Sequence, residues 1–310
     1  MIKHTIKLAG EEARGARISG RALSLLLDRL RDATLRTLRL RVEGRSHLRG
    51  DIKWLEQAAD FELVGLEMGS TVLEIESRPL RETAPDIFQQ LPLWENQLDE
   101  ESTALGLFEN TLRDAVTGNA ESDLLDRPIL QSITMFREIL NLGFSSMEFG
   151  DQRTNASVSV TPEGLVRAER LCVEAPTAFK GIVSGFLEQL TFSKQTFKLR
   201  IAGGITLRGI LPRIDPSNYA HLWGKKVTIE GEIHFRPSGA VSLIAADHIQ
   251  AATEGDSLWE HAPRPRPRSL SDLAPRNPLP HGQSGFARIF GRLPEDETNE
   301  DTEASLQEIS

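Results

Sequence analysis

The residues between Thr177 and Ala251 constrain the fold most, because short β-strand patterns follow one another there without a helical interval. The candidate strands are residues 182–187, 196–201, 205–210, 226–233 and 241–244. Gly203-Gly204 and Pro237-Ser238-Gly239 are turn signals between neighbouring strands. Five short strands at this spacing predict a small closed β-barrel over residues 177–256.

Residues 1–80 alternate between strand and helix periods and predict a small α+β domain. Ile2 to Leu8 has a strand pattern, and Ser19 is placed as the N-cap of a helix with leucines at 23, 26, 27 and 30. Residues 38–42 alternate strictly, which predicts a strand with one buried and one basic face. Residues 61–66 and 71–76 flank Met68-Gly69-Ser70 and predict a β-hairpin.

Residues 81–176 predict a mainly helical connecting region. Apolar residues at helical spacing form two stripes, 105, 108, 112, 116 and 129, 133, 136, 140, and Gly118 and Gly143 stand where those helices should stop. Such stripes usually pack in a core, so packing is favoured over a cofactor-binding role. Ala156 to Val160 predicts one more strand, followed by Thr161 as N-cap and Pro162 at the first helical position.

Composition argues against several classes of protein. The chain has 310 residues and a net charge of -9, with no long apolar run and no apolar signal region near Met1, so we expect a cytoplasmic protein without a membrane partner. The single cysteine, Cys172, cannot form an internal disulfide or a multi-thiolate zinc site, and its apolar neighbours predict a small core residue.

Enzyme motifs are missing from the sequence. There is no phosphate-binding loop, dinucleotide fingerprint or nucleophile elbow. His221, His234 and His248 lack the spacing of a helical zinc site and are expected to be structural. Glu74 and Glu76 share one face of a strand, which a solvated acidic face explains as well as acid–base catalysis does. We therefore expect a non-enzymatic protein without cofactor or metal. The alternative is an enzyme whose site is assembled from separate segments of the chain.

The predicted barrel also carries cations interleaved with aromatic residues. The cations are Lys194, Lys198, Arg200, Arg208, Lys225 and Lys226, and the aromatic residues are Phe192, Phe197, Tyr219, Trp223 and Phe235. Proteins that bind single-stranded nucleic acids combine these two residue types. The alternative is that the aromatic rings fill the barrel while the cations solvate its outside. The acidic balance of the chain supplies no general attraction to phosphate.

Residues 257–310 predict a Pro/Arg-rich linker and a partner-binding tail. The Pro-Arg repeat at 263–268 either contacts RNA or an acidic protein surface, or acts as an extended spacer. Phe286, Ile289, Phe290 and Leu293 have the spacing of helical anchors, although Gly291 weakens a helix. Arg288 and Arg292 would share an adjoining face. Residues 295–310 contain acids and no Lys or Arg, which is typical of a disordered, solvated tail or of one that binds a basic surface.

Residues 290–298, Phe-Gly-Arg-Leu-Pro-Glu-Asp-Glu-Thr, followed by an acidic segment that ends Leu306-Gln307-Glu308-Ile309-Ser310, carry a resemblance. They resemble the C-terminal segment of antitoxins that neutralise PIN-domain ribonuclease toxins. The resemblance implies a tail that wraps the toxin and occludes its acidic, metal-binding site, with Arg292 as the occluding cation. The matching positions are Gly291, Leu293, Pro294, Asp296 and Glu297, while Glu295 stands where the family is expected to have glycine. The larger domains before the tail also differ from the small DNA-binding domain typical of such antitoxins.

These patterns together predict an α+β protein with a small N-terminal sheet and helix, a helical connection, a C-terminal five-stranded barrel and a disordered tail. The barrel resembles an OB-like fold, and no motif separates it from an SH3-like barrel. The predicted function is that of an antitoxin-like inhibitor, which occludes a ribonuclease toxin with its tail. The alternative is a protein that binds single-stranded nucleic acid through the barrel.

Overall fold

The computed structural model describes residues 1–13, 15–47, 53–67, 71–85, 99, 101–192, 195–212 and 215–265. These residues belong to one compact unit, which contains two five-stranded sheets and several helices. The mixed α+β class predicted from the sequence is confirmed. Within the described residues, every helix is too short or too polar to cross a membrane.

The first sheet is antiparallel and has the strand order β2-β3-β1-β4-β5. Its strands are β1 (Ile2–Gly10), β2 (Phe61–Glu67), β3 (Thr71–Ser77), β4 (Phe144–Asp151) and β5 (Ala156–Val160). The strand β1 lies at the centre because it pairs with β3 on one side and β4 on the other. Its residues His4, Ile6 and Leu8 alternate with more exposed residues and are buried on one face. The predicted hairpin of β2 and β3 is confirmed.

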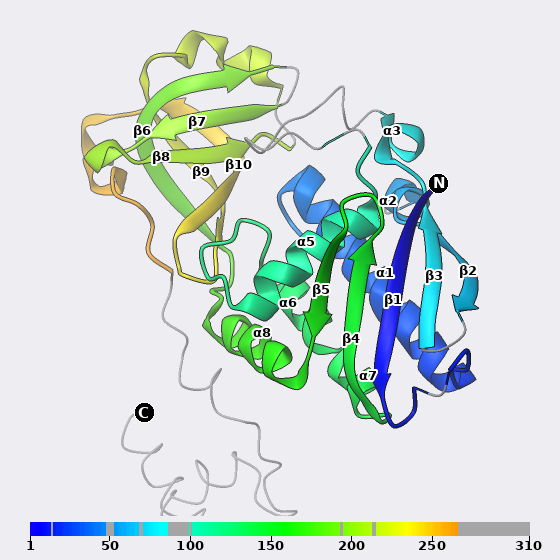
Figure 1. Ribbon diagram of the computed structural model, residues 1–310. Coiled ribbons are helices and arrows are strands. Elements are labelled where there is room, and N and C mark those ends of the chain that lie inside the picture. Colours follow the sequence, from blue (N-terminus) through cyan, green and yellow to red (C-terminus); the bar gives the residue numbers. More distant parts are fainter. Residues whose placement is uncertain are drawn as a thin grey trace, which may run out of the picture. The chain divides into compact units, whose positions relative to one another are not determined.

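Helices cover one face of this sheet, and no described helix covers the other (Figure 1). They are α1 (Gly20–Glu43), α2 (Lys53–Ala58), α3 (Leu80–Thr83), α5 (Ala104–Thr117), α6 (Arg127–Thr134), α7 (Arg137–Leu140) and α8 (Pro162–Glu174). Ser19 and Thr161 cap α1 and α8 as predicted, each accepting from the backbone N–H three residues on. The rings of Phe108, Phe136 and Phe149 lie with centroids 5.8 to 5.9 Å apart in the core between helices and sheet.

The strand predicted for residues 38–42 is wrong, because these residues form the last turns of α1. Leu38, Arg39 and Leu40 are all buried, so the segment has no separate basic face. A five-residue alternation of apolar and polar residues is compatible with a strand and also with one turn of a helix that is buried on several sides. In this chain the helical spacing of buried residues that includes Leu26 and Leu30 continues through this segment. The helix ends at Gly44, whose φ of 71° is left-handed.

The region between residues 81 and 176 contributes strands as well as helices. The strand β4 was absent from the sequence prediction, and it pairs with β1 along residues His4 to Gly10. The sheet expected of residues 1–80 is therefore completed by later residues, because β4 supplies the second neighbour of β1. The helical stripes do pack in the core as expected, and Gly118 and Gly143 have positive φ at their predicted stops.

The second sheet contains all five strands predicted between residues 177 and 251. They are β6 (Phe179–Thr191), β7 (Thr196–Arg200), β8 (Thr206–Ile210), β9 (Lys226–Phe235) and β10 (Val241–Ala251), and they form a closed barrel in the order β10-β8-β7-β6-β9. All pairs are antiparallel except β8 with β10. Short 3-10 helices, Ala202–Gly204, Pro216–Leu222 and Glu254–Trp259, connect or follow these strands.

Candidate functional site

The outward face of the barrel brings part of the predicted cationic set beside an aromatic ring. In register across four strands lie Lys226 on β9, Phe186 on β6, Arg200 on β7 and Thr206 on β8. Residues directly opposite each other on paired strands share a face of the sheet, so these four form one line, here named the Phe186 row. Phe186 is 47% exposed, and the Arg200 Cζ lies 5.8 Å from its ring centroid.

Two further aromatic rings are exposed on the barrel. Trp223 is 66% exposed, and its indole N–H donates to the Glu188 carbonyl at 3.1 Å, which fixes the ring beside β6. Phe192, which directly follows β6, is 49% exposed. An exposed ring held by a hydrogen bond loses little further conformational freedom when a base stacks on it.

The other aromatic residues of the predicted set pack in the barrel core or against it. Phe197 and Phe235 are buried, and Tyr219 packs against the same core. The interpretation that aromatic rings fill the barrel is therefore right for these three residues and wrong for Phe192 and Trp223. Phe186 was missing from the prediction, although its neighbour Leu187 points inward and strand alternation places Phe186 outside.

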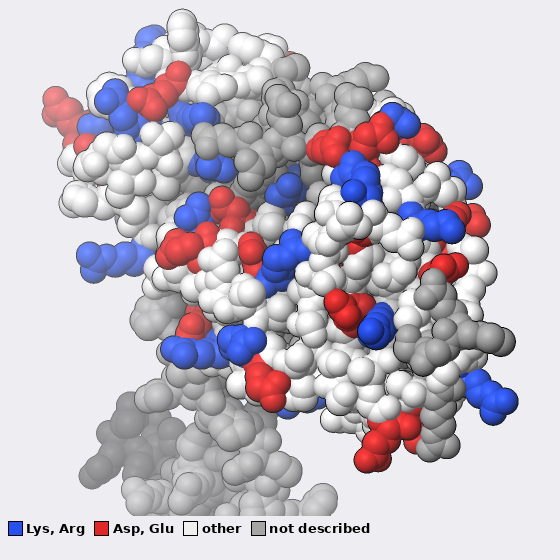
Figure 2. Space-filling model, viewed as in Figure 1, with Lys and Arg blue, Asp and Glu red and all other residues white. Residues whose placement is uncertain are grey.

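Carboxylates lie beside three of the six predicted cations. Arg200 Nε lies 2.7 Å from Glu188 Oε1, Lys226 pairs with Glu260, and Arg208 Nη1 lies 3.8 Å from Asp123 Oδ2. Lys225 is exposed. On the face seen in Figure 2, acidic and basic side chains are likewise interspersed. The surface around the Phe186 row is thus aromatic and only weakly positive.

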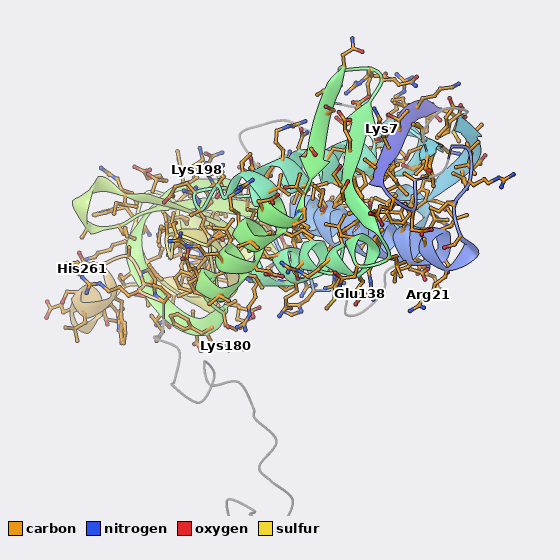
Figure 3. All side chains as sticks on the ribbon, turned by 60° about the horizontal axis from the view of Figure 1, so that its bottom comes forward. Lys7, Arg21, Glu138, Lys180, Lys198 and His261 are labelled. Atoms are coloured by element: carbon orange, nitrogen blue, oxygen red, sulfur yellow. The ribbon has the colours of Figure 1, made fainter. Side chains whose placement is uncertain are left out.

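Lys198 and Arg208 lie outside the Phe186 row but on the same outward face. They are directly opposite each other on β7 and β8, and Lys198 is two residues from Arg200 on one strand. Figure 3 shows Lys198 and Lys180 on different sides of the barrel, where Lys180 pairs with Asp247 at 2.8 Å. Lys194 lies outside the described residues.

A polar junction joins the barrel to the loop between α5 and α6. Arg236, which follows β9, donates from Nε to Asp123 Oδ1 at 2.6 Å and from Nη1 to Glu121 Oε2 at 3.4 Å. The backbone N–H of Ser238 donates to the Ala120 carbonyl at 3.1 Å. The β9–β10 turn is therefore held by both side-chain and backbone bonds.

Buried titratable groups lie in the same junction. The Ser46 hydroxyl donates to the Asp126 carboxylate at 2.6 Å, and Asp126 also caps α6 by accepting from Ile129 N at 3.0 Å. Burial raises the pKa of Asp126, while hydrogen bonds from Ser46 and Ile129 oppose that rise. Burial lowers the pKa of His234, which lies close enough to Asp126 for their charges to interact. Both groups therefore favour their neutral forms more than they would in water.

The predicted histidines do not converge. His221 and His248 are exposed, whereas the side chain of His234 is only 13% exposed in the junction. No group of three or more His, Cys, Asp or Glu within the described residues has the arrangement needed to hold a metal ion. Cys172 is partly buried and packs against the core, as its apolar neighbours predicted. Glu74 and Glu76 are directly opposite Thr5 and Lys3, on the face of the first sheet away from the buried His4, Ile6 and Leu8.

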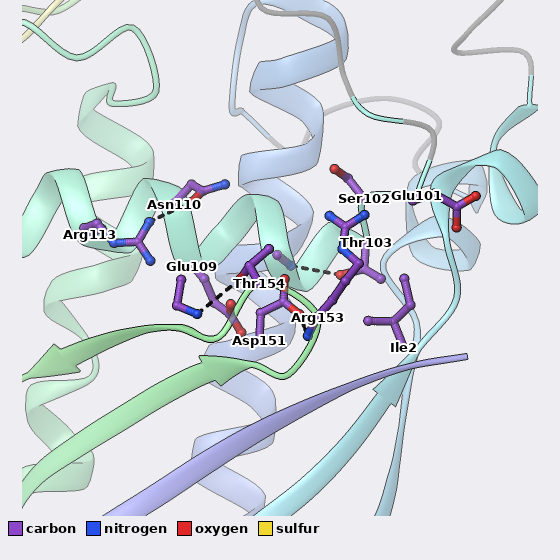
Figure 4. Close-up of a pocket in the computed structure, with 12 residues that line it drawn as sticks. Ile2, Glu101, Ser102, Thr103, Glu109, Asn110, Arg113, Asp151, Arg153 and Thr154 are labelled. Atoms are coloured by element: carbon purple, nitrogen blue, oxygen red, sulfur yellow. Dashed lines mark hydrogen bonds between the residues drawn. The ribbon is translucent and has the colours of Figure 1, made fainter.

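A small recess opens beside a buried hydrogen-bonded network at the edge of the first sheet (Figure 4). His4 Nδ1 lies 2.9 Å from Glu109 Oε1, and His4 Nε2 lies 2.9 Å from Thr103 Oγ1. The recess has a volume of about 60 Å³ and is also lined by Asp151 and Arg153. Its position could not be derived from the sequence, because His4 lies about a hundred positions before both Thr103 and Glu109 and the three form no local motif.

The order hydroxyl, imidazole, carboxylate in this network matches that of nucleophilic triads. The Thr103 hydroxyl is nevertheless 2% exposed and already caps α5 by accepting from Gly106 N at 3.0 Å. In this structure the hydroxyl has almost no surface for a substrate carbonyl to approach, and it already serves as a helix cap. We therefore assign the network a structural role in joining β1 to α5.

Comparison of the chain with protein-family models, with curated proteins and with solved structures finds no match. The predicted partner-binding residues of the tail, Phe286, Arg288, Ile289, Phe290, Arg292 and Leu293, lie outside the described residues. Within the described residues, the Phe186 row and the junction around Asp123 are the arrangements that bring sequence-predicted site residues together.

Proposed function

We propose that this chain is a cytoplasmic, non-enzymatic binding protein that neutralises a PIN-domain ribonuclease through its C-terminal segment. The observation that carries this proposal is the sequence of residues 290–298 with its following acidic run. In this proposal Arg292 opposes the carboxylates that would bind the catalytic metal of the ribonuclease. A guanidinium beside acidic groups forms strong charge-assisted hydrogen bonds and competes with a metal for them.

Apolar residues before Arg292 supply the binding energy in this proposal. Burying Phe286, Ile289, Phe290 and Leu293 in a groove would each contribute about 1.5–3 kcal/mol. Part of that energy offsets the cost of ordering the segment on binding. The acids after Pro294 would then pair with basic groups on the ribonuclease or remain solvated, while Arg288 contacts an adjoining acidic group.

The test captures the partner with the full-length chain, identifies it by mass spectrometry and assays its RNA cleavage with Mg²⁺ or Mn²⁺. We expect a PIN-domain ribonuclease that the full chain inhibits and a variant lacking residues 285–310 does not. Arg292→Ala should weaken inhibition strongly, and Arg276→Ala, an arginine outside the anchor, serves as its matched control. Equal binding by the full chain and the truncated variant overturns the proposal.

A second candidate function, binding of single-stranded nucleic acid by the barrel, is favoured by the Phe186 row. We propose an OB-like barrel. When β6 to β10 are numbered one to five along the chain, neighbouring strands around the barrel follow the order one, two, three, five, four and back to one, and the third and fifth are parallel. Barrels of that kind bind oligonucleotides on the face of the second and third strands, here β7 and β8. Arg200 and Lys198 on β7 and Arg208 on β8 point outward there.

Fluorescence anisotropy with labelled oligothymidylate tests this second function. Phe186→Ala and Trp223→Ala should each weaken binding by about 1–3 kcal/mol, the contribution of one stacked base. Ile182→Ala is the matched control, because Ile182 is an exposed apolar residue on the same strand. No binding at low salt by the unmodified chain rejects this function.

A further inference from the structure

Two barrel arginines contact Asp123, and a third arginine lies within range of its charge. Arg236 donates to its Oδ1 at 2.6 Å, and Arg208 Nη1 lies 3.8 Å from its Oδ2. Arg41, near the end of α1, is close enough for the charge of Asp123 to oppose the fall in pKa that burial imposes on Arg41. Glu121 adds a second carboxylate to Arg236. The site is thus a cluster of guanidinium groups around an anion.

The cluster requires an anion for electrostatic reasons. Guanidinium groups cannot lose their charge in a protein, so bringing several together is unfavourable unless a negative group lies between them. The planar donor set of arginine binds carboxylate and phosphate oxygens with the same geometry. A phosphodiester can therefore accept hydrogen bonds from these arginines and balance their charge, as the Asp123 carboxylate does in this structure.

The loop that carries Asp123 is held in place from within the N-terminal part of the chain. Ser122 donates to Asp114 at 2.5 Å, Leu125 is buried in the core of the first sheet, and Asp126 caps α6. These bonds do not involve the barrel. Asp123 is therefore presented to the barrel arginines by a preformed support.

Arg208 and Arg236 lie on the path that a single-stranded nucleic acid bound on the Phe186 row would follow across the barrel. Arg208 is directly opposite Lys198, which shares an outward face with Arg200. Arg236 begins the β9–β10 turn, which corresponds to the loop between the fourth and fifth strands that also binds ligands in OB-like barrels. A strand that stacks on Phe186 can thus bring a phosphate toward Arg208 and Arg236.

We propose that Arg208 and Arg236 form a phosphodiester-binding pair, and that Asp123 fills this site in the free protein. Asp123 acts as an intramolecular competitor, so a single strand binds fully only after it displaces the carboxylate. This inference rests on the proposed binding of single-stranded nucleic acid by the barrel. In this inference, nucleic-acid binding weakens the contact of the barrel with the α5–α6 loop, because the phosphodiester and Asp123 compete for Arg208 and Arg236.

The decisive variant is Asp123→Asn. The amide oxygen can still accept from Arg236, so the loop contact persists while the competing charge is removed. Asp247→Asn is the matched control, because it removes one carboxylate from a pair with Lys180 on the same barrel. Lys180 is six residues from Phe186 along β6, about 20 Å away at the rise of a strand.

Affinity for labelled oligothymidylate is measured between about 50 and 200 mM NaCl. We expect Asp123→Asn to bind at least about fivefold tighter than Asp247→Asn, with a log–log salt slope steeper by about 0.7 for each phosphate gained. Adding Arg236→Ala to Asp123→Asn should cancel the gain. Equal affinity and equal slope for the two single variants overturn the inference.

The outcomes separate this inference from the function on which it rests. Binding by the unmodified chain that Phe186→Ala weakens and Asp123→Asn leaves unchanged rejects only the competitor role of Asp123. No binding by the chain, Asp123→Asn or Asp247→Asn at the lowest salt rejects both. If Asp123→Asn no longer unfolds cooperatively, Glu121→Gln is the second variant, and an unchanged salt slope for it counts against the inference.

Discussion

His4 Nδ1 lies 2.9 Å from Glu109 Oε1, and this contact joins the central strand β1 to helix α5. Both side chains are more than nine-tenths buried, so the carboxylate has little water to replace its partner. We expect His4→Ala to lower the free energy of unfolding by about 3–5 kcal/mol, because it leaves a buried carboxylate unpaired. Urea unfolding of the full chain measures this loss.

A double-mutant cycle tests whether that loss belongs to the pair. His4→Ala with Glu109→Ala should cost clearly less than the two single variants summed, because the second truncation removes the group that the first left unpaired. Strict additivity would show that the two side chains contribute independently and would contradict this account of the contact.

Gly44 is expected to be intolerant of any side chain. Its φ of 71° already disfavours an L residue, and a Cβ at this position would overlap Leu243 Cδ2 on β10. Gly118→Ala is the matched control, since Gly118 has a φ of 81° but its Cβ would make only ordinary contacts with Arg167. Gly118→Ala should cost about 1–2 kcal/mol, and Gly44→Ala clearly more. Thermal unfolding compares the two, and equal losses would mean that Leu243 adjusts without cost.

Stability should fall between neutral and mildly acidic pH through His234. Burial lowers the pKa of His234, opposed by the charges of Glu232 and Asp126 and reinforced by those of Arg45 and His47. The unfolded chain therefore binds this proton first as pH falls below about 6.5, and the stability that neutral His234 contributes is lost as pH falls further toward its folded pKa. The limiting slope is about 1.4 kcal/mol per pH unit.

Asp126 acts in the opposite direction within the same junction. Burial raises its pKa, so the stability contributed by its neutral form is present at low pH and lost as pH rises through the raised value.

The contribution of His234 is measured by urea unfolding at pH 7.5 and 5.5. Between these two pH values, the free energy of unfolding should decrease less for His234→Gln than for the unmodified chain. The exposed histidine variant His248→Gln is the control, and identical pH dependence for both variants would contradict the assignment to His234.

Aromatic residues of the barrel should separate into two classes when truncated. Phe197→Ala is expected to cost about 3–5 kcal/mol, because it empties the centre of the barrel core. Phe186→Ala, on the exposed row, should change stability by about 0.5 kcal/mol or less. Thermal unfolding distinguishes the classes, and a large loss for Phe186→Ala would make its ring a structural element.

The barrel strands could be predicted because turn signals separate them. Gly203-Gly204 and Pro237-Ser238-Gly239 mark chain reversals that an α-helix does not accommodate, and the neighbouring strands are rich in branched residues. Residues 38–42 were mispredicted for the opposite reason. No turn residue separates them from the preceding part of α1, so their short alternation alone does not distinguish a strand from the end of that helix.

The arrangement of the candidate site could be predicted only in part. The cations of β7 and β8 were identified, but a sequence does not show that Asp123 lies between Arg208 and Arg236, since these residues are distant along the chain. Phe186 was accessible to reasoning, because alternation with Leu187 decides its face once the strand is accepted. The contact of His4 with Glu109 joins residues 105 positions apart and carries no local signal.

The central place of β1 in the first sheet affects how the chain acquires its structure during synthesis. The strand β1 leaves the ribosome well before β4, at residues 144–151, and gains its second neighbour only when β4 has also emerged. Until then the backbone N–H and C=O groups along its second edge have no partner strand, and the closure of this long loop carries an entropic cost. A nascent chain of this protein is therefore exposed to mispairing for the time that roughly 140 residues take to be made, about 7 to 30 seconds at bacterial or eukaryotic rates. A chaperone that shields β1 would act on this interval.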